Sequence, residues 1–107
     1  MNILKKVKKM VKGDEIFARY ECGISTDGNK FVLYAVASYG TRLCGKGETL
    51  AEACRDLESE AYSGKIWSGA RESGSDDPEW CEQMDAENIC EYVDAVREIA
   101  GIAAYYP

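Results

Sequence analysis

The stretch of residues 41–61 constrains the fold of this chain more than any other segment. It reads Thr-Arg-Leu-Cys-Gly-Lys-Gly-Glu-Thr-Leu-Ala-Glu-Ala-Cys-Arg-Asp-Leu-Glu-Ser-Glu-Ala. This pattern predicts a short strand over 41–45, a Gly-x-Gly turn and a helix over 49–62. Thr49 and Glu52 form a capping box, in which each side chain accepts a hydrogen bond from the other residue's backbone amide. The helix would direct its apolar side chains to one face, formed by Leu50, Ala53, Cys54, Leu57 and Ala61.

Three elements are predicted upstream of this segment. Apolar residues recur at helical spacing through residues 3–11, between lysines, so a short amphipathic helix is expected to dock on the domain. Apolar and polar residues alternate through 16–24, which predicts a half-buried strand. The apolar run 31–39 predicts the central strand of the sheet, and Asp27-Gly28 supplies the positive φ angles of a hairpin turn between the two strands.

The remainder of the chain predicts a loop and a final helix. Residues 64–77 hold three glycines and three serines without periodicity, as is typical of a loop. Asp77 and Pro78 are the expected N-cap and first position of a helix over 79–104. The apolar stripe of this helix consists of Ile89, Val93, Val96, Ala100 and Ala103.

A length of 107 residues predicts one domain. We expect an α+β fold in the order α-β-β-β-α-α, with helices packed on one face of a three-stranded antiparallel sheet. The domain would comprise a basic N-terminal helix over 1–12, a β-β-β-α unit over 14–62, a loop over 63–77 and an acidic helical segment over 78–107.

The residue types argue against catalysis. The chain has no histidine, which removes the commonest general base and the commonest transition-metal ligand. It has five cysteines, but none of them forms the C-x-x-C pair on which zinc sites are usually built. We therefore predict that the protein is not an enzyme and binds no cofactor or metal.

The cysteines and the N-terminus also predict a compartment. The lysines of the first twelve residues interrupt the apolar positions, so no signal peptide is recognised. Cysteines are then expected to stay reduced in the cytoplasm, as small buried hydrophobes. No apolar run approaches the roughly 20 residues that span a bilayer, so no membrane segment is predicted.

Charge is segregated along the chain, whose net charge is −6. The first twelve residues carry the lysines Lys5, Lys6, Lys8, Lys9 and Lys12. Residues 72–98 carry ten carboxylates and one basic residue, Arg97. One interpretation is a solvated acidic face that keeps the protein soluble. The other is a surface that docks on a basic partner protein.

Two tryptophans flank the predicted loop. Trp67 and Trp80 stand on either side of it, and Arg71 lies between them. Such a Trp either closes an edge of the core or anchors a partner, since aromatic residues and Arg dominate binding hot spots. Together with the acidic segment, these residues define a candidate partner-binding set of Trp67, Arg71, Asp76, Asp77, Glu79, Trp80, Glu82, Glu87 and Glu91.

Residues 1–62 resemble the double-stranded-RNA-binding domain. The matching segments are Tyr20-Glu21-Cys22, Phe31 to Val36, and Gly45-Lys46-Gly47-Glu48-Thr49-Leu50-Ala51-Glu52-Ala53. The resemblance implies an α-β-β-β-α topology. The HicB-like antitoxins are similar in another way, since they share a strand followed by Gly-x-Thr-x-x-Glu-Ala and a helix.

The chain departs from that family where RNA would be bound. The lysine pair that grips phosphates in the family would fall at Leu50 and Ala51, and its Pro-His element is absent from residues 25–29. Because phosphate contacts supply most of the nonspecific affinity for RNA, we expect little binding of duplex RNA.

These observations predict a small, acidic, non-enzymatic protein-binding module in the cytoplasm. Its partner would be a protein with a basic surface, and it would suit a phage or mobile-element inhibitor of a nucleic-acid-handling, host-defence protein. The alternatives are a nucleic-acid-binding protein that uses the N-terminal lysines, a HicB-like antitoxin, and a carboxylate-dependent enzyme. The sequence leaves open whether the chain is a monomer or a dimer.

Overall fold

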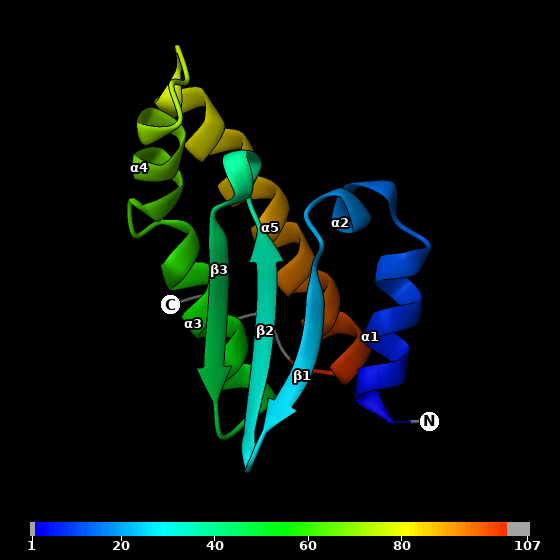
Figure 1. Ribbon diagram of the computed structural model, residues 1–107. Coiled ribbons are helices and arrows are strands. Elements are labelled where there is room, and N and C mark those ends of the chain that lie inside the picture. Colours follow the sequence, from blue (N-terminus) through cyan, green and yellow to red (C-terminus); the bar gives the residue numbers. More distant parts are fainter. Residues whose placement is uncertain (1, 103–107) are drawn as a thin grey trace.

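The computed structural model describes residues 2–102 and has an α+β fold, as predicted. A three-stranded antiparallel sheet in the order β1-β2-β3 packs against helices on one face (Figure 1). The elements are α1 (Ile3–Lys12), α2 (Glu15–Arg19), β1 (Gly23–Asp27), β2 (Lys30–Val36), the 3-10 turn η1 (Ser38–Gly40), β3 (Arg42–Gly47), α3 (Leu50–Ala61), α4 (Lys65–Glu72) and α5 (Pro78–Ala100).

The sheet and α3 agree with the elements predicted from residues 41–61 and from the hairpin before them. The β1–β2 hairpin closes with Asp27 paired to Lys30, and Gly28 adopts a φ of 61° in the turn. Thr49 is the N-cap of α3, and its hydroxyl accepts a hydrogen bond of 3.1 Å from the amide of Glu52. All five residues of the predicted apolar face of α3 are buried. The predicted capping position and helix face are therefore confirmed.

The Gly-x-Gly motif lies in β3 rather than in a turn. Gly45 and Gly47 are both buried strand residues that face α3. A Cβ atom at Gly45 would lie 2.3 Å from the backbone nitrogen of Leu57, far inside van der Waals contact. These glycines let the backbone of α3 approach β3 closely, so their role is packing and not chain reversal.

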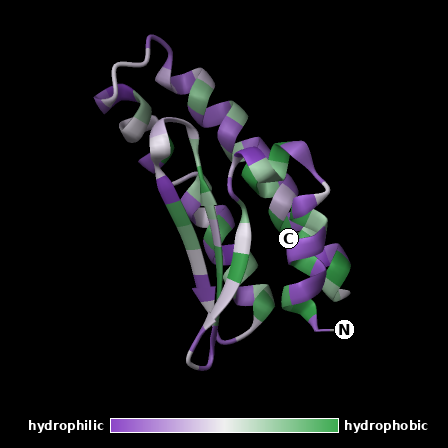
Figure 2. Ribbon diagram, turned by 45° about the vertical axis from the view of Figure 1, so that its right-hand side comes forward, coloured by the Kyte–Doolittle hydropathy of each residue, from purple (hydrophilic) through white to green (hydrophobic). Residues whose placement is uncertain are grey.

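The core lies between the sheet and the two helices behind it in Figure 1, α3 and α5. Ile24, Leu33 and Leu43 from the three strands are almost fully buried there. Tyr92 of α5 is also fully buried, and its hydroxyl donates a hydrogen bond of 2.6 Å to the carbonyl oxygen of Gly23. Figure 2 shows hydrophilic and hydrophobic residues alternating along α1 and α5, as expected of helices with one face on a core.

The predicted strand over 16–24 is wrong from Ile16 to Cys22, because α2 ends at Arg19, a turn follows, and β1 begins only at Gly23. The side chain of Asp14 caps this helix by accepting hydrogen bonds from the amides of Ile16 and Phe17. The helix ends in a Schellman motif, in which the amide of Cys22 bonds the carbonyl of Phe17 and the amide of Glu21 bonds the carbonyl of Ala18. Glu21 takes the left-handed position, with a φ of 48°. Because that position is usually glycine, the sequence carries no visible stop signal.

The predicted loop over 63–77 contains a helix, α4. Ile66 and Ala70 lie one turn apart and are fully buried. Gly69 suggests a helix breaker, yet a Cβ atom there would lie 2.0 Å from Oγ1 of Thr41. This glycine therefore permits close packing of α4 on the start of β3. The packing outweighs the low helix propensity of glycine.

The boundaries of two other elements also differ from the prediction. The central strand ends at Val36 instead of continuing to residue 39, because the chain turns through η1. The last helix begins at Pro78 with Asp77 as its N-cap, as predicted, and ends at Ala100 before Gly101 in the left-handed conformation. Ala103, predicted to extend the apolar stripe, lies outside the described residues.

Candidate functional site

Four carboxylates form a row on the outward side of α5. A helix turns about 100° per residue, which places Glu87, Glu91, Asp94 and Glu98 within a sector of about 60°. All four side chains are exposed, and at about 1.5 Å of rise per residue the row extends for roughly 16 Å. We call these four residues the acidic stripe.

Of the acidic stripe, Asp94 alone pairs with a basic residue of its own helix among the described residues. Among the described residues, Glu87, Glu91 and Glu98 take part in no ion pair, and Asp94 contacts Nη1 of Arg97 at 3.1 Å. Arg97 is 5% exposed and donates hydrogen bonds to both carboxylate oxygens of Glu58 on α3, one of them 2.8 Å long. These bonds raise the pKa of Arg97 above its usual value. The positive charge of Arg97 is therefore shared between Glu58 and Asp94, and the acidic stripe keeps a net negative charge.

Tyr62 lies beside the acidic stripe, at the C-cap of α3. Its side chain is 63% exposed. The pKa of Tyr62 is raised by partial burial of the hydroxyl, by the neighbouring thiol of Cys90, and by the carboxylates of Glu87 and Glu58. Tyr62 thus joins α3 to the acidic surface of α5, a contribution that was not predicted. Its position four residues after Glu58, on the same side of the helix, is the signal that could have indicated it.

The beginning of α5 extends this surface. Asp76, Asp77, Glu79 and Trp80 are exposed there. Trp80 is 57% exposed and falls in the same helical sector as the acidic stripe, about 10 Å before Glu87. Oδ1 of Asp77 accepts a hydrogen bond of 3.0 Å from the amide of Trp80, so Asp77 also has a structural role as N-cap.

Three residues of the predicted set lie apart from the acidic stripe. Glu82 is half-buried and about 140° around the helix from Glu87. Trp67 and Arg71 are on α4, where the guanidinium carbon of Arg71 lies 5.2 Å from the centre of the half-buried Trp67 ring. This cation–π contact orders the pair. The structure therefore divides the predicted set between two helices.

Asp85, one of the ten acidic residues of segment 72–98, does not belong to the surface. It is fully buried, and its carboxylate accepts hydrogen bonds from the Tyr20 hydroxyl at 2.7 Å and from the amide of Ser38 at 2.9 Å. Burial and the bond to Asp85 raise the pKa of Tyr20 to about 12. The network ties α2 and η1 to α5, so Asp85 acts as a structural link.

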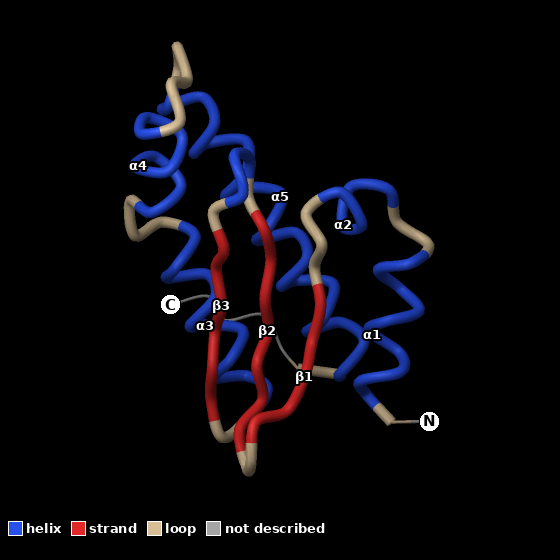
Figure 3. The backbone as a smooth tube through the Cα atoms, viewed as in Figure 1, coloured by secondary structure: helices blue, strands red, loops and turns tan. Residues whose placement is uncertain are grey.

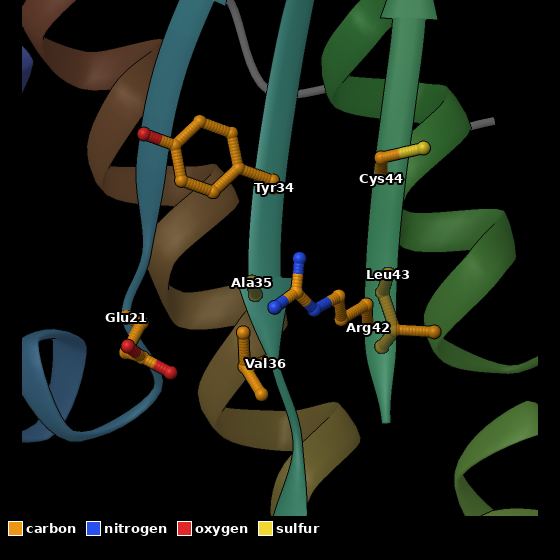
Figure 4. Close-up of a pocket in the computed structure, with 7 residues that line it drawn as sticks. All are labelled: Glu21, Tyr34, Ala35, Val36, Arg42, Leu43 and Cys44. Atoms are coloured by element: carbon orange, nitrogen blue, oxygen red, sulfur yellow. The ribbon is translucent and has the colours of Figure 1, made fainter. Parts of the chain in front are cut away.

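The opposite face of the sheet carries a hollow that was not predicted. No helix crosses this face in Figure 3. A pocket of about 410 Å³ lies on it, and Figure 4 shows the residues that line it, chiefly Glu21, Tyr34, Val36, Arg42 and Cys44. We call this side of the sheet the open face.

The cysteines behave as small core residues, with one exception. Cys22, Cys54 and Cys81 are buried and Cys90 is half-buried. Burial raises the pKa of Cys22 to about 12 and that of Cys54 to about 11, which keeps both thiols protonated at neutral pH. Cys44 is exposed on β3, so the prediction of buried cysteines fails at this position.

Within residues 2–102, no group of three or more Cys, Asp or Glu residues is placed to hold a metal ion. In the same range, no helix combines the length and apolar character needed to cross a membrane. The chain matches no protein-family model, and no curated protein or solved structure is significantly similar to it. The resemblance to the double-stranded-RNA-binding domain therefore stays a prediction.

Proposed function

We propose that this chain is a small, non-enzymatic protein-binding module whose acidic helical surface docks on a basic partner protein. The observation that supports this proposal is the acidic stripe, an exposed row of four carboxylates flanked by Tyr62 and Trp80. Aromatic side chains beside a charged row have the character of binding hot spots, in which charge steers the encounter and the rings supply affinity.

A protein that handles nucleic acid is the class of partner that fits this surface best. Such proteins present grooves of Lys and Arg that contact a row of phosphates. The carboxylates of the acidic stripe follow one another at about 5 Å along the helix axis, the same order as the 3.4 Å per phosphate along one strand of duplex DNA. A row of carboxylates held this way would compete with nucleic acid for the groove.

Competition of this kind is inhibition. We extend the proposal to an inhibitor of a host-defence protein, encoded by a phage or another mobile element, on the basis of the small size and acidity of the chain. The N-terminal resemblance, with its missing lysine pair, is compatible with a scaffold that has lost nucleic-acid binding.

The proposal is tested with a charge-reversal variant, Glu87→Lys/Glu91→Lys/Glu98→Lys. Its matched control is Glu15→Lys/Glu48→Lys/Glu72→Lys, which changes the net charge equally at exposed positions on other elements. Each immobilised variant is exposed to a bacterial lysate, and bound proteins are eluted with duplex DNA. We expect wild type and control to retain nucleic-acid-binding proteins that DNA releases, and the stripe variant to lose them.

Two results would contradict the proposal. In the first, the stripe variant, shown to be folded by a thermal melt, retains the same proteins as the control. In the second, duplex DNA releases nothing from wild type, so that the bound surface of the partner is not the one that holds nucleic acid.

One observation favours a second candidate function. All five lysines of α1 are exposed, and the buried Val7 turns the opposite side of the helix toward the domain. This basic side of α1 would contact phosphates if the chain bound nucleic acid directly. Segment 72–98, with its single basic residue, would oppose such binding wherever the phosphates approached it.

A further inference from the structure

The open face of the sheet has an ordered arrangement of charge. The register pairs Val36 with Arg42. Continued by two residues beyond Gly23, which pairs with Tyr34, the β1–β2 register brings Glu21 level with Val36. The amide of Val36 bonds the carbonyl of Tyr20, one residue out of this register, so the pairing is irregular where Glu21 takes its left-handed conformation. Figure 4 shows Glu21, Val36 and Arg42 level with one another across the sheet, with Glu21 on the β1 side and the Arg42 side chain reaching from β3 over β2.

The middle of the open face is apolar. Val32, Tyr34 and Val36 follow one another on β2, and Tyr34 is 39% exposed. Its ring lies across β1, because a Cβ atom at Gly23 would be 2.3 Å from the ring. Within the described chain, Glu21 and Arg42 form no ion pair with each other. The open face thus carries apolar side chains on β2 and residues of opposite charge on its two sides, Glu21 beside β1 and Arg42 on β3, with Lys46 further along β3.

We propose that two copies of this chain pack their open faces together around a two-fold axis that runs nearly along β2. This axis lays β3 of one copy over β1 of the other and leaves every residue in its own row. Arg42 of each copy then faces Glu21 of the other copy, and two reciprocal ion pairs close the edges of the interface. Val32 and Val36 meet their own counterparts at the centre, at the sheet separation of about 10 Å, and the Tyr34 ring of each copy, which lies across its own β1, faces β3 of the other copy.

The alternative symmetric packing lacks this complementarity. A two-fold axis across the strands would lay β1 on β1 and β3 on β3, so that this row would bring no Glu21 opposite an Arg42. The charges of the open face therefore select one geometry among the two symmetric ones. The interface would be smaller than the roughly 800 Å² per partner of standard complexes, so association is expected to be weak and concentration-dependent.

The inference is independent of the proposed function, since it uses the face of the sheet that α3 and α5 do not cover. It is tested by sedimentation velocity of the full chain from about 10 μM to about 1 mM, a range suited to weak interfaces. Two single variants, Glu21→Arg and Arg42→Glu, place like charges opposite each other in a homodimer. Each should raise the dissociation constant about tenfold or more. Glu15→Arg and Lys8→Glu are the matched controls at exposed positions off this face.

A mixture of the two variants gives the decisive reading. In a heterodimer, the arginine introduced by Glu21→Arg faces the glutamate introduced by Arg42→Glu, while the second contact keeps the native pair. We therefore expect native mass spectrometry to show a heterodimer as stable as the wild-type dimer, and homodimers of either variant that are weaker by about tenfold or more. Restoration between two different chains cannot arise from an ion pair inside one chain.

Three outcomes would overturn the inference. If the wild-type chain stays monomeric at the highest concentration, the open face does not bind a second copy of the chain. A wild-type dimer that Glu21→Arg and Arg42→Glu leave intact uses another surface. Single variants that lose the dimer without restoring it on mixing, although thermal melts show them folded, would rule out the reciprocal contact of Glu21 and Arg42.

Discussion

Glu21 shows at the scale of one residue how this chain accepts strain. It occupies the left-handed position of the Schellman motif after α2, with a φ of 48°. A residue with a Cβ atom is strained there by about 1–2 kcal/mol, whereas glycine is not. The charge at this position is the one that we assign to the open face, which gives the strain a function.

Glu21→Gly should therefore stabilise the isolated chain by about 1 kcal/mol. Glu21→Ala is the control, because alanine removes the carboxylate and keeps the Cβ atom. A thermal or urea melt that shows destabilisation by Glu21→Gly, or equal gains for both variants, would contradict the assignment of strain to this backbone position.

Buried thiols and the Tyr20 phenol make stability depend on alkaline pH. Burial raises the pKa of Cys22 from 9.0 to about 12, that of Cys54 from 9.0 to about 11, and that of Tyr20 from 10.0 to about 12. A raised pKa means that the folded state favours the neutral form of the group. Its contribution to the free energy of unfolding is therefore complete at pH values below the pKa that the group has in the unfolded chain. That contribution is lost as the pH rises toward the folded pKa.

The free energy of unfolding should accordingly stay level to about pH 9 and fall between about pH 9 and 12. Cys22→Ala removes one of the groups that cause the fall, so its slope in urea melts at pH 9 to 11 should be shallower than that of wild type. An unchanged slope would show that ionisation of Cys22 does not oppose folding.

At the scale of elements, apolar side chains that repeat at helical spacing determine which face of a helix packs against the core. Leu57 on α3 and Val93 on α5 are both fully buried on the faces where they were predicted. Leu57→Ala and Val93→Ala should each lower the free energy of unfolding by about 2–4 kcal/mol, because each leaves a cavity in the core. Losses under half a kcal/mol at both positions in thermal melts would mean that these faces are packed differently.

The elements that were predicted and those that were missed differ in the kind of signal they carry. The N-terminus of α3 carries a side-chain cap at Thr49, and the β1–β2 turn carries Gly28, so both are visible in one segment of sequence. The end of α2 has Glu21 where glycine is usual, and α4 holds Gly69 because of a contact with Thr41. Those signals depend on tertiary contacts, which short-range patterns do not contain.

The candidate site follows the same division. The exposed side of α5 was predictable, because Glu87 and Glu91 repeat with the helix. Tyr62 and the open face were not, since they depend on the packing of α3 against α5 and on the register of three strands. Asp85 was counted among the acidic residues of segment 72–98 because local sequence does not show that three donors enclose it.

At the scale of the whole molecule, basic and acidic charge occupy different helices. The exposed lysines are on α1, and the acidic stripe is on α5. Binding of duplex RNA or DNA should therefore be weak and lost at moderate salt, because the dense positive surface of residues 2–102 lies on α1. Fluorescence anisotropy at increasing salt checks this. Sub-micromolar, sequence-independent binding at about 150 mM salt would favour direct nucleic-acid binding over a protein partner.

We propose that a partner binds at the acidic helical surface. The most direct test of this proposal is carboxylate labelling of the chain, free and in complex with a partner captured on it, read by mass spectrometry. We expect Glu87, Glu91 and Glu98 to become protected in the complex, while Glu15, Glu48 and Glu72 label as in the free chain. Equal labelling of the stripe carboxylates in both states would contradict the proposal.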